Sequence, residues 1–148
     1  MTAYVDASVI LRLAFGQANA LAEWPKIQRG VASALVTTES LRSLDRLRLR
    51  ARLSDEEVAT RRAAILSLIA SLEVVELDAN VLDRASQPMP TELGTLDAIH
   101  LATALLWKAM TAGELTMATH DDALGVAAKA HGLPVIGIGQ VAIAVREA

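Results

Sequence analysis

Four acidic residues are notable because each follows a short apolar segment or begins a helical one. They are Asp6, Glu39, Asp97 and Asp121. In an open parallel sheet with right-handed crossovers, strand carboxyl ends and the helix amino ends that follow them emerge at one edge, where ligands bind. Carboxylates gathered there repel one another unless a cation neutralises them, and Mg²⁺ and Mn²⁺ are hard cations that prefer oxygen ligands. The sequence therefore predicts a metal-dependent enzyme acting on phosphate.

Each of these acids also has a purely structural explanation. Aspartate is a favoured N-cap, which is sufficient to account for Asp6, Asp97 and Asp121 taken singly. Glu39 fits equally well as a first-turn residue favoured by the helix dipole. Their shared placement beside strand ends favours the pocket, and a helix amino end stabilises the ionised carboxylate that a metal requires.

The elements that would position these acids follow from the apolar periodicity. It predicts strands at about 3–5, 34–37, 72–77, 115–118 and 134–138. It predicts helices at about 7–15, 18–28, from Glu39 onward, from the Ser54 capping box onward, at 78–85, from Thr95 onward and at 121–132. The order βααβααβααβαβ is typical of a parallel sheet with helices on both faces, an α/β architecture.

Length and composition set the class of protein. The 148 residues fit one domain, 1–148, and the apolar fraction of 53% with only 3% aromatic residues indicates an aliphatic interior. No apolar run is long enough to cross a bilayer, and MTAYVDAS lacks the features of a secretory signal. The absence of cysteine excludes disulfides and thiolate metal sites. We expect a cytoplasmic protein with no membrane association.

Four segments carry a resemblance to a known family. They are YVDASVILRL with Asp6, LVTTESLRSL with Glu39, GTLDAIHLATAL with Asp97, and MATHDDALGVAAKAHGLPVIG with Asp121. In order and spacing they resemble the PIN-domain ribonucleases, in particular the VapC toxins of bacterial toxin–antitoxin pairs, over nearly the whole chain. The T-x-D register favours Asp121 over the adjacent Asp122, which then serves as the helix cap or a partial ligand.

The resemblance implies a three-layer PIN-like fold, with a central parallel sheet of about five strands. It also implies that the four acids are the catalytic and metal-binding residues of a Mg²⁺- or Mn²⁺-dependent endoribonuclease. RNA would be hydrolysed by water whose pKa the metal lowers, with one or two ions, leaving a 5′-phosphate and a 3′-hydroxyl. The implied partners are RNA and a small antitoxin protein that inhibits the toxin.

Residues near the acids have alternative interpretations. Ser8 and Thr119 either orient ligands or water, or make local capping and turn bonds. His100 lies three residues after Asp97 on the same helical face. It is either a metal ligand, a proton shuttle, or a half-buried histidine whose ring nitrogens have hydrogen-bond partners. The arginine run from Arg42 to Arg52 either contacts RNA phosphates or acidic groups of a partner, or forms a solvated helix face.

Two other functions compete with a nuclease. A haloacid-dehalogenase-like phosphatase also begins with a strand and an Asp, but Ser8 stands where its second acid is expected. A noncatalytic binding module acting through complex formation is disfavoured because all four acids are present. The highly aliphatic composition favours apolar surface covered by a second copy, as a homodimer, or by an antitoxin helix.

Overall fold

A parallel five-stranded sheet forms the centre of the computed structural model, which describes residues 1–139. Its strands are β1 (Thr2–Val5), β2 (Arg29–Ser33), β3 (Glu73–Val75), β4 (Thr116–Ala118) and β5 (Val135–Ile136). They are ordered β3-β2-β1-β4-β5, and every neighbouring pair is parallel. The chain builds outward from β1 to β3 and then returns to the other side of β1 with β4. This reversal creates a switch point at the carboxyl ends of β1 and β4, where α/β proteins bind ligands.

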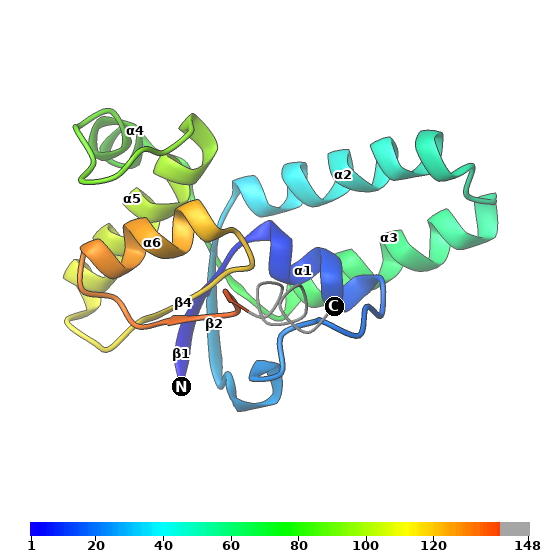
Figure 1. Cartoon of the computed structure of the whole chain (residues 1–148), viewed down its shortest axis with the longest axis horizontal. Helices are drawn as coiled ribbons and strands as arrows, with labels where there is room; N and C mark the ends of the chain where they lie inside the picture. Colours follow the sequence, from blue (N-terminus) through cyan, green and yellow to red (C-terminus); the bar gives the residue numbers. More distant parts are fainter. Residues whose placement is uncertain (140–148) are drawn as a thin grey trace.

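Helices cover both faces of the sheet (Figure 1). They are α1 (Ala7–Ala14), α2 (Leu35–Ala51), α3 (Asp55–Ala70), α4 (Ala79–Ala85), α5 (Thr95–Thr111) and α6 (Asp122–Ala130), with a short 3₁₀ helix η1 (Trp24–Lys26). Because strand side chains alternate between faces, Ala3 and Val5 contribute to one core and Tyr4 to the other. The predicted α/β fold, with its parallel sheet of five strands, is confirmed.

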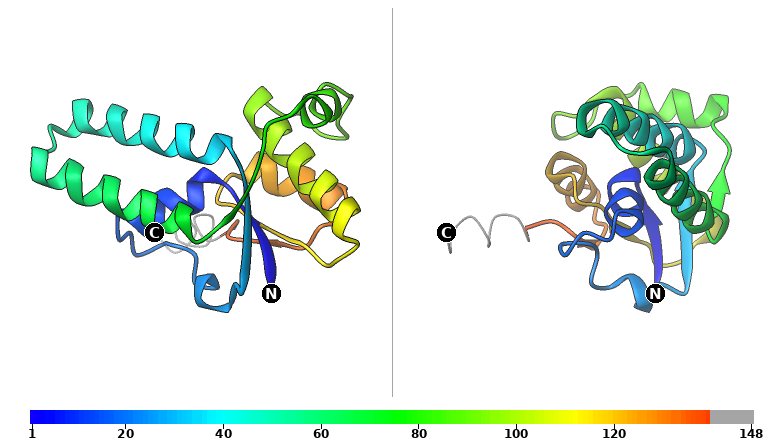
Figure 2. Two further views of the ribbon diagram at one scale, coloured as in Figure 1. Left: turned by 180° about the vertical axis from the view of Figure 1, so that it is seen from behind. Right: turned by 90° about the vertical axis from the view of Figure 1, so that its right-hand side faces the viewer.

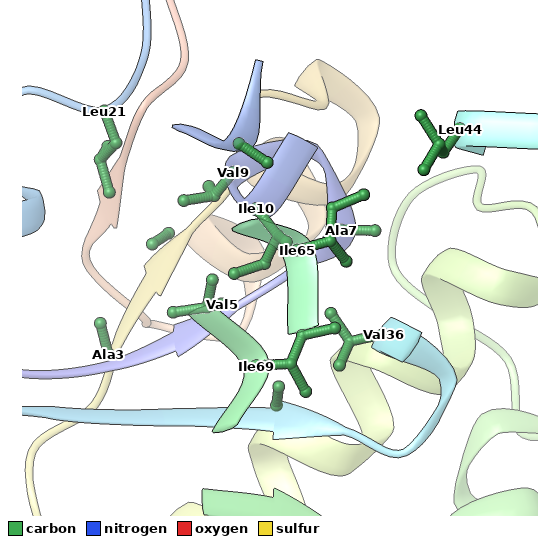
Figure 3. Packing of buried hydrophobic residues seen from close by; sticks show 13 residues of the cluster. Ala3, Val5, Ala7, Val9, Ile10, Leu21, Val36, Leu44, Ile65 and Ile69 are labelled. Carbon is green, nitrogen blue, oxygen red and sulfur yellow. The ribbon is translucent and has the colours of Figure 1, made fainter. Parts of the chain in front are cut away.

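The two cores differ in the helices that supply them. Figure 3 shows the first core, in which Val5 of β1 lies near Val9 and Ile10 of α1 and near Ile65 and Ile69 of α3. The second core joins the opposite face of the sheet to α5 and α6. Its buried members include Tyr4, Val31, Leu101, Met117 and Leu124. Together the two cores fix α1 and α5 against β1, and these helices begin next to the switch point.

Helices α2 and α3 form a hairpin whose far end projects beyond the sheet (Figures 1 and 2). Arg52 ends α2 in the left-handed conformation, with φ 50°. Ser54 then begins α3 with the predicted capping box: its hydroxyl accepts from the Glu57 N–H, and the Glu57 carboxylate accepts from the Ser54 N–H. The arginine run of the sequence therefore lies on α2 and at the tip of this hairpin.

Two predicted elements are wrong. Residues 18–28 form turns and η1, because Pro25 cannot donate a helical hydrogen bond. The strand expected at 34–37 is instead β2, at Arg29–Ser33, so 35–37 form the first turn of α2. Gly30 lies in β2, where a Cβ atom would collide with the Leu72 side chain.

The remaining predicted elements are confirmed with shifts of a few residues at their ends. Within residues 1–139, no helix has the length and apolar character needed to cross a membrane.

Candidate active site

A pocket of about 410 Å³ lies at the carboxyl edge of the sheet, and all four predicted acids line it. Asp6 follows β1, Asp121 lies beyond β4, Glu39 is in the second turn of α2, and Asp97 is in the first turn of α5. Four segments that are distant in sequence thus contribute one carboxylate each. The remaining lining residues are Ala7, Ser8, Leu11, Leu35, Thr38, Arg42, Ser43, Arg46, Leu96 and His100.

Asp6 is the most deeply placed of the four, with an exposed fraction of 5%. Its Oδ1 accepts from the Ser8 hydroxyl at 2.5 Å and from the Val9 N–H at 3.3 Å, while Oδ2 accepts from the Thr119 hydroxyl at 2.6 Å. Burial raises the pKa of Asp6, although the hydrogen bonds from Ser8 and Thr119 oppose that rise. Asp6 is therefore both an N-cap and a member of the pocket.

Ser8 and Thr119 also connect Asp6 to the loop after β4. The Ser8 Oγ accepts from the His120 N–H at 2.9 Å, and the Thr119 Oγ1 accepts from the Asp121 N–H at 3.0 Å. Each hydroxyl thus orients Asp6 and holds the segment that carries Asp121. The local turn bonds expected for these residues are therefore present, together with bonds to the Asp6 carboxylate.

Asp121, rather than Asp122, is the residue that faces the pocket. Its Oδ1 caps α6 by accepting from the Leu124 N–H at 2.9 Å. The expectation that Asp122 is the helix cap is wrong, since Asp122 is the first residue of α6, is exposed and does not line the pocket. The choice of Asp121 from the T-x-D register therefore agrees with the geometry.

Asp97 has the most unusual electrostatic environment of the group. Gly94 occupies the N-cap position of α5, so Asp97 is not the cap that a purely structural explanation required. Desolvation, together with the nearby charges of Asp121, Asp6 and Glu39, raises the pKa of Asp97 to about 6, against a smaller opposing effect of His100. Like charges gathered in a partly buried pocket have this effect, and a bound cation would reverse it.

Glu39 is paired with His100. The ring Nε2 of His100 lies within hydrogen-bond distance of Glu39 Oε1, and its Nδ1 lies 2.6 Å from the Tyr4 hydroxyl oxygen. Burial disfavours the charged imidazole, but the hydrogen bond to Glu39 and the charges of Glu39, Asp6 and Asp97 outweigh it and raise the pKa of His100. His100 is 1% exposed, so it is more buried than the half-buried residue expected from the sequence.

Arginines of α2 line one side of the pocket. Arg42 forms an ion pair with Asp45 at 3.0 Å, and Arg48 forms another with the same carboxylate at 3.0 Å. Arg46 lies between them in sequence, lines the pocket, and donates to the Ser43 hydroxyl at 3.0 Å. Among residues 1–139, no ion pair involves Arg46, so its charge is available to an anion in the pocket.

The donor types suit a hard divalent cation, because carboxylate oxygens are the ligands that Mg²⁺ and Mn²⁺ prefer. In the part of the chain that the structure describes, however, no three His, Asp or Glu side chains already stand where they would hold an ion. Desolvation is the main cause of the raised pKa of Asp97, and the charges of Asp121, Asp6 and Glu39 add to it. The pocket therefore fits the cation in the chemistry of its donor groups, four carboxylates that line one pocket.

Comparison with known proteins gives the family. The model of the PIN domain matches residues 3–136, which include all four acids. The chain belongs to the PIN-domain family. Ribonuclease VapC46 of Mycobacterium tuberculosis is 35% identical over 136 residues, which are 90% of this chain and 95% of that protein. Ribonuclease VapC35 of the same species is 33% identical over 146 residues, 93% of this chain and 97% of that protein.

Solved structures share the PIN fold. A toxin–antitoxin complex from Klebsiella pneumoniae superposes with a TM-score of 0.62 at 16% identity, covering 92% of this chain and 94% of that chain. The resemblance to VapC proteins that the four sequence segments carried is confirmed by the PIN-domain match and by the identities with VapC46 and VapC35.

Sequence reasoning missed Tyr4, whose hydroxyl reaches His100 from inside the PIN-domain core. The sequence indicated only that Tyr4 and Val5 point to opposite faces of the sheet, because side chains alternate along a strand.

A larger pocket of about 730 Å³ lies between β3, α4 and α5, and none of the four acids lines it. Its lining is largely apolar and includes Trp107 and Met110.

Proposed function

We propose that this PIN-domain protein is a Mg²⁺- or Mn²⁺-dependent endoribonuclease and the toxin of a toxin–antitoxin pair. The observation that carries the proposal is one pocket lined by Asp6, Glu39, Asp97 and Asp121, in a chain 35% identical to a protein named Ribonuclease VapC46. The four carboxylates would hold the cation. When bound, it would polarise the scissile phosphodiester and lower the pKa of the attacking water.

The chain's own residues would position the reactants. Ser8 and Thr119 keep Asp6 oriented, and Asp121 is fixed at the amino end of α6 by its own capping bond. Arg46 would bind a phosphate of the RNA beside the scissile one, because its guanidinium lines the same pocket. Hydrolysis would add water across the bond, leaving a 5′-phosphate on one product and a 3′-hydroxyl on the other.

The proposed partners are RNA, an antitoxin protein and a second copy of the chain. The likeness to a toxin–antitoxin complex from Klebsiella pneumoniae supports an antitoxin. The apolar 730 Å³ pocket and Met110, which is 86% exposed, support burial of surface by another chain. We place the activity in the cytoplasm, where the RNA substrate is found, and the lack of cysteine is compatible with a reducing compartment.

The test is cleavage of total cellular RNA by purified protein with Mg²⁺, with Mn²⁺ or with a chelator, followed by mapping of the new 5′ ends. We expect discrete metal-dependent cuts bearing 5′-phosphates, which disappear with the chelator and in the Asp6→Asn variant. Cleavage that persists in both conditions would exclude the proposed mechanism.

A further inference from the structure

Glu39 is held in the pocket by a single hydrogen-bond donor. Within residues 1–139, its side chain bonds only to His100, whereas the carboxylate of Asp6 accepts from three donors. A glutamate also has one more rotatable bond than an aspartate, so ordering it costs more conformational entropy. The direction in which the Glu39 carboxylate points therefore depends on His100.

Helix α5 determines where that donor stands. His100 follows Asp97 by three residues, about one helical turn, so both side chains face the pocket edge of α5. His100 is buried between α5 and the sheet, and its ring meets the ring of Tyr4 edge-on, with centroids 5.8 Å apart and planes at 71°. Both ring nitrogens have partners, so His100 is not free to act as a further metal ligand.

The partners of Tyr4 assign the protons of this group. The Ser33 N–H donates to the Tyr4 hydroxyl oxygen at 3.2 Å, and an N–H group can act only as a donor. The hydroxyl proton is then available for donation to His100 Nδ1, which is 2.6 Å away. Burial raises the pKa of Tyr4, so the hydroxyl retains that proton. The imidazole proton is left on Nε2, facing Glu39.

We propose that His100 is a positioning residue for Glu39, and that Tyr4 holds His100 in the tautomer that donates to Glu39. One chain of hydrogen bonds then runs from the Ser33 backbone in β2, through β1 and α5, to a carboxylate on α2. Histidine ligands are oriented in this way by a second group, but here the histidine orients an acid. The role assigned to Glu39, as a ligand of the divalent cation, rests on the proposed function.

The tautomer tests the proposal without metal or RNA. Long-range ¹H–¹⁵N spectra of the metal-free full chain, recorded above the titration midpoint of His100, distinguish a proton on Nε2 from one on Nδ1. We expect the Nε2–H form in the wild type and a mixture of tautomers in Tyr4→Phe, which removes a single oxygen. A wild-type ring protonated on Nδ1, or a Tyr4→Phe spectrum identical to wild type, would overturn the proposal.

Mn²⁺ affinity tests the consequence for Glu39. We expect His100→Leu to weaken Mn²⁺ binding about 10- to 100-fold, the range for groups that orient metal ligands, while the control His131→Leu has no effect. His100→Gln, whose amide nitrogen can donate near the Nε2 position, should recover most of the affinity. Equal affinity in His100→Leu and wild type, or a His100→Gln variant as weak as His100→Leu, would refute positioning.

The two measurements separate the two proposals. A wild-type protein that binds no Mn²⁺ would refute the proposed function, and the tautomer spectra would then decide alone whether Tyr4 and His100 are arranged as stated. A thermal unfolding curve for each variant distinguishes a loss of Mn²⁺ affinity from a loss of folding.

Discussion

Asp97 and Asp6 differ in how the pocket holds their carboxylates. The carboxylate of Asp6 is fixed by three hydrogen-bond donors within the protein. Asp97 has a half-buried side chain, and neighbouring carboxylates oppose its ionisation and contribute to raising its pKa to about 6. Electrostatic repulsion of this kind costs stability, and a bound cation would relieve it.

Replacement of either residue by Asn should therefore remove activity without unfolding the protein. We expect Asp6→Asn and Asp97→Asn to lower RNA cleavage by more than about a hundredfold, beyond the 10- to 100-fold effect typical of groups that only orient ligands. Metal-free Asp97→Asn should also gain stability near neutral pH, on the order of 1 kcal/mol after solvent screening is allowed for. Urea unfolding and cleavage assays measure the two effects, and normal cleavage by either folded variant would contradict the site assignment.

Thr119 links two acids, so its hydroxyl should matter to both stability and activity. In Thr119→Val the shape is kept, but Asp6 loses a donor and the Asp121 N–H loses its acceptor. We expect a loss of about 1–3 kcal/mol in the free energy of unfolding, with reduced cleavage. Thr119→Ser retains the hydroxyl and is the matched control; a Thr119→Val protein as stable as Thr119→Ser would show that the bridge contributes nothing.

At the scale of elements, the sequence predicted strand and helix type better than position. The periodicity of α1, α3, α5 and α6 located those helices, because each has a cap or an apolar stripe of its own. The segment 34–37 was mispredicted because β-branched Val36 and Thr37 favour a strand locally, while packing of Val36 into the core places them in α2.

The pairing of Glu39 with His100 could not be predicted from the sequence, because it too depends on tertiary packing. It depends on how α2 and α5 approach each other at the pocket, which follows from the sheet and not from either helix alone. The aspartates were predictable because each lies close to a strand end or a helix start in the sequence itself. Once α2 began four residues earlier than expected, Glu39 was no longer a first-turn residue, and only the tertiary structure brings it to the pocket.

Helix α2 also supplies a test that separates one arginine from its neighbours. Arg46→Ala should weaken RNA binding, because Arg46 lines the pocket and has no ion pair among residues 1–139. Arg48→Ala is the matched control, since Arg48 lies on the same helix but is paired with Asp45. Measured against salt concentration, the binding slope should fall by about one for a lost phosphate contact. Equal effects of the two variants would mean that the arginine run is an ordinary charged surface with no specific phosphate contact at Arg46.

At the scale of the whole molecule, the strand order β3-β2-β1-β4-β5 is what gathers the acids. The alternation of strands and helices predicted a parallel sheet, but it contains no information on which side of β1 the later strands are added. Because β4 returns to the side of β1 opposite β2, the loops after β1 and β4 become neighbours at the switch point. Asp6 and Asp121 meet there, with Glu39 and Asp97 supplied by helices that flank the same edge.

This gathering should make the stability of the metal-free protein depend on pH. The folded-state pKa of Asp97, about 6, exceeds its usual value of 3.8, and those of Asp6 and His100 are also raised. Between pH 3.8 and about pH 6 the Asp97 carboxyl binds more protons in the folded state than in the unfolded state, so stability should fall as the pH rises through that range. Urea unfolding across that range measures the slope.

Saturating Mg²⁺ or Mn²⁺ should reverse the trend, because the cation competes with protons for the same carboxylates. At a concentration about a hundred times the dissociation constant, binding to the folded state alone adds about 2.7 kcal/mol at neutral pH, and less as Asp97 becomes protonated. Asp97→Asn should show both a flatter pH dependence without metal and a smaller gain with it. If the free energy of unfolding of the wild type changes with neither pH nor divalent cations, the charges of these carboxylates do not interact measurably, although the side chains line one pocket.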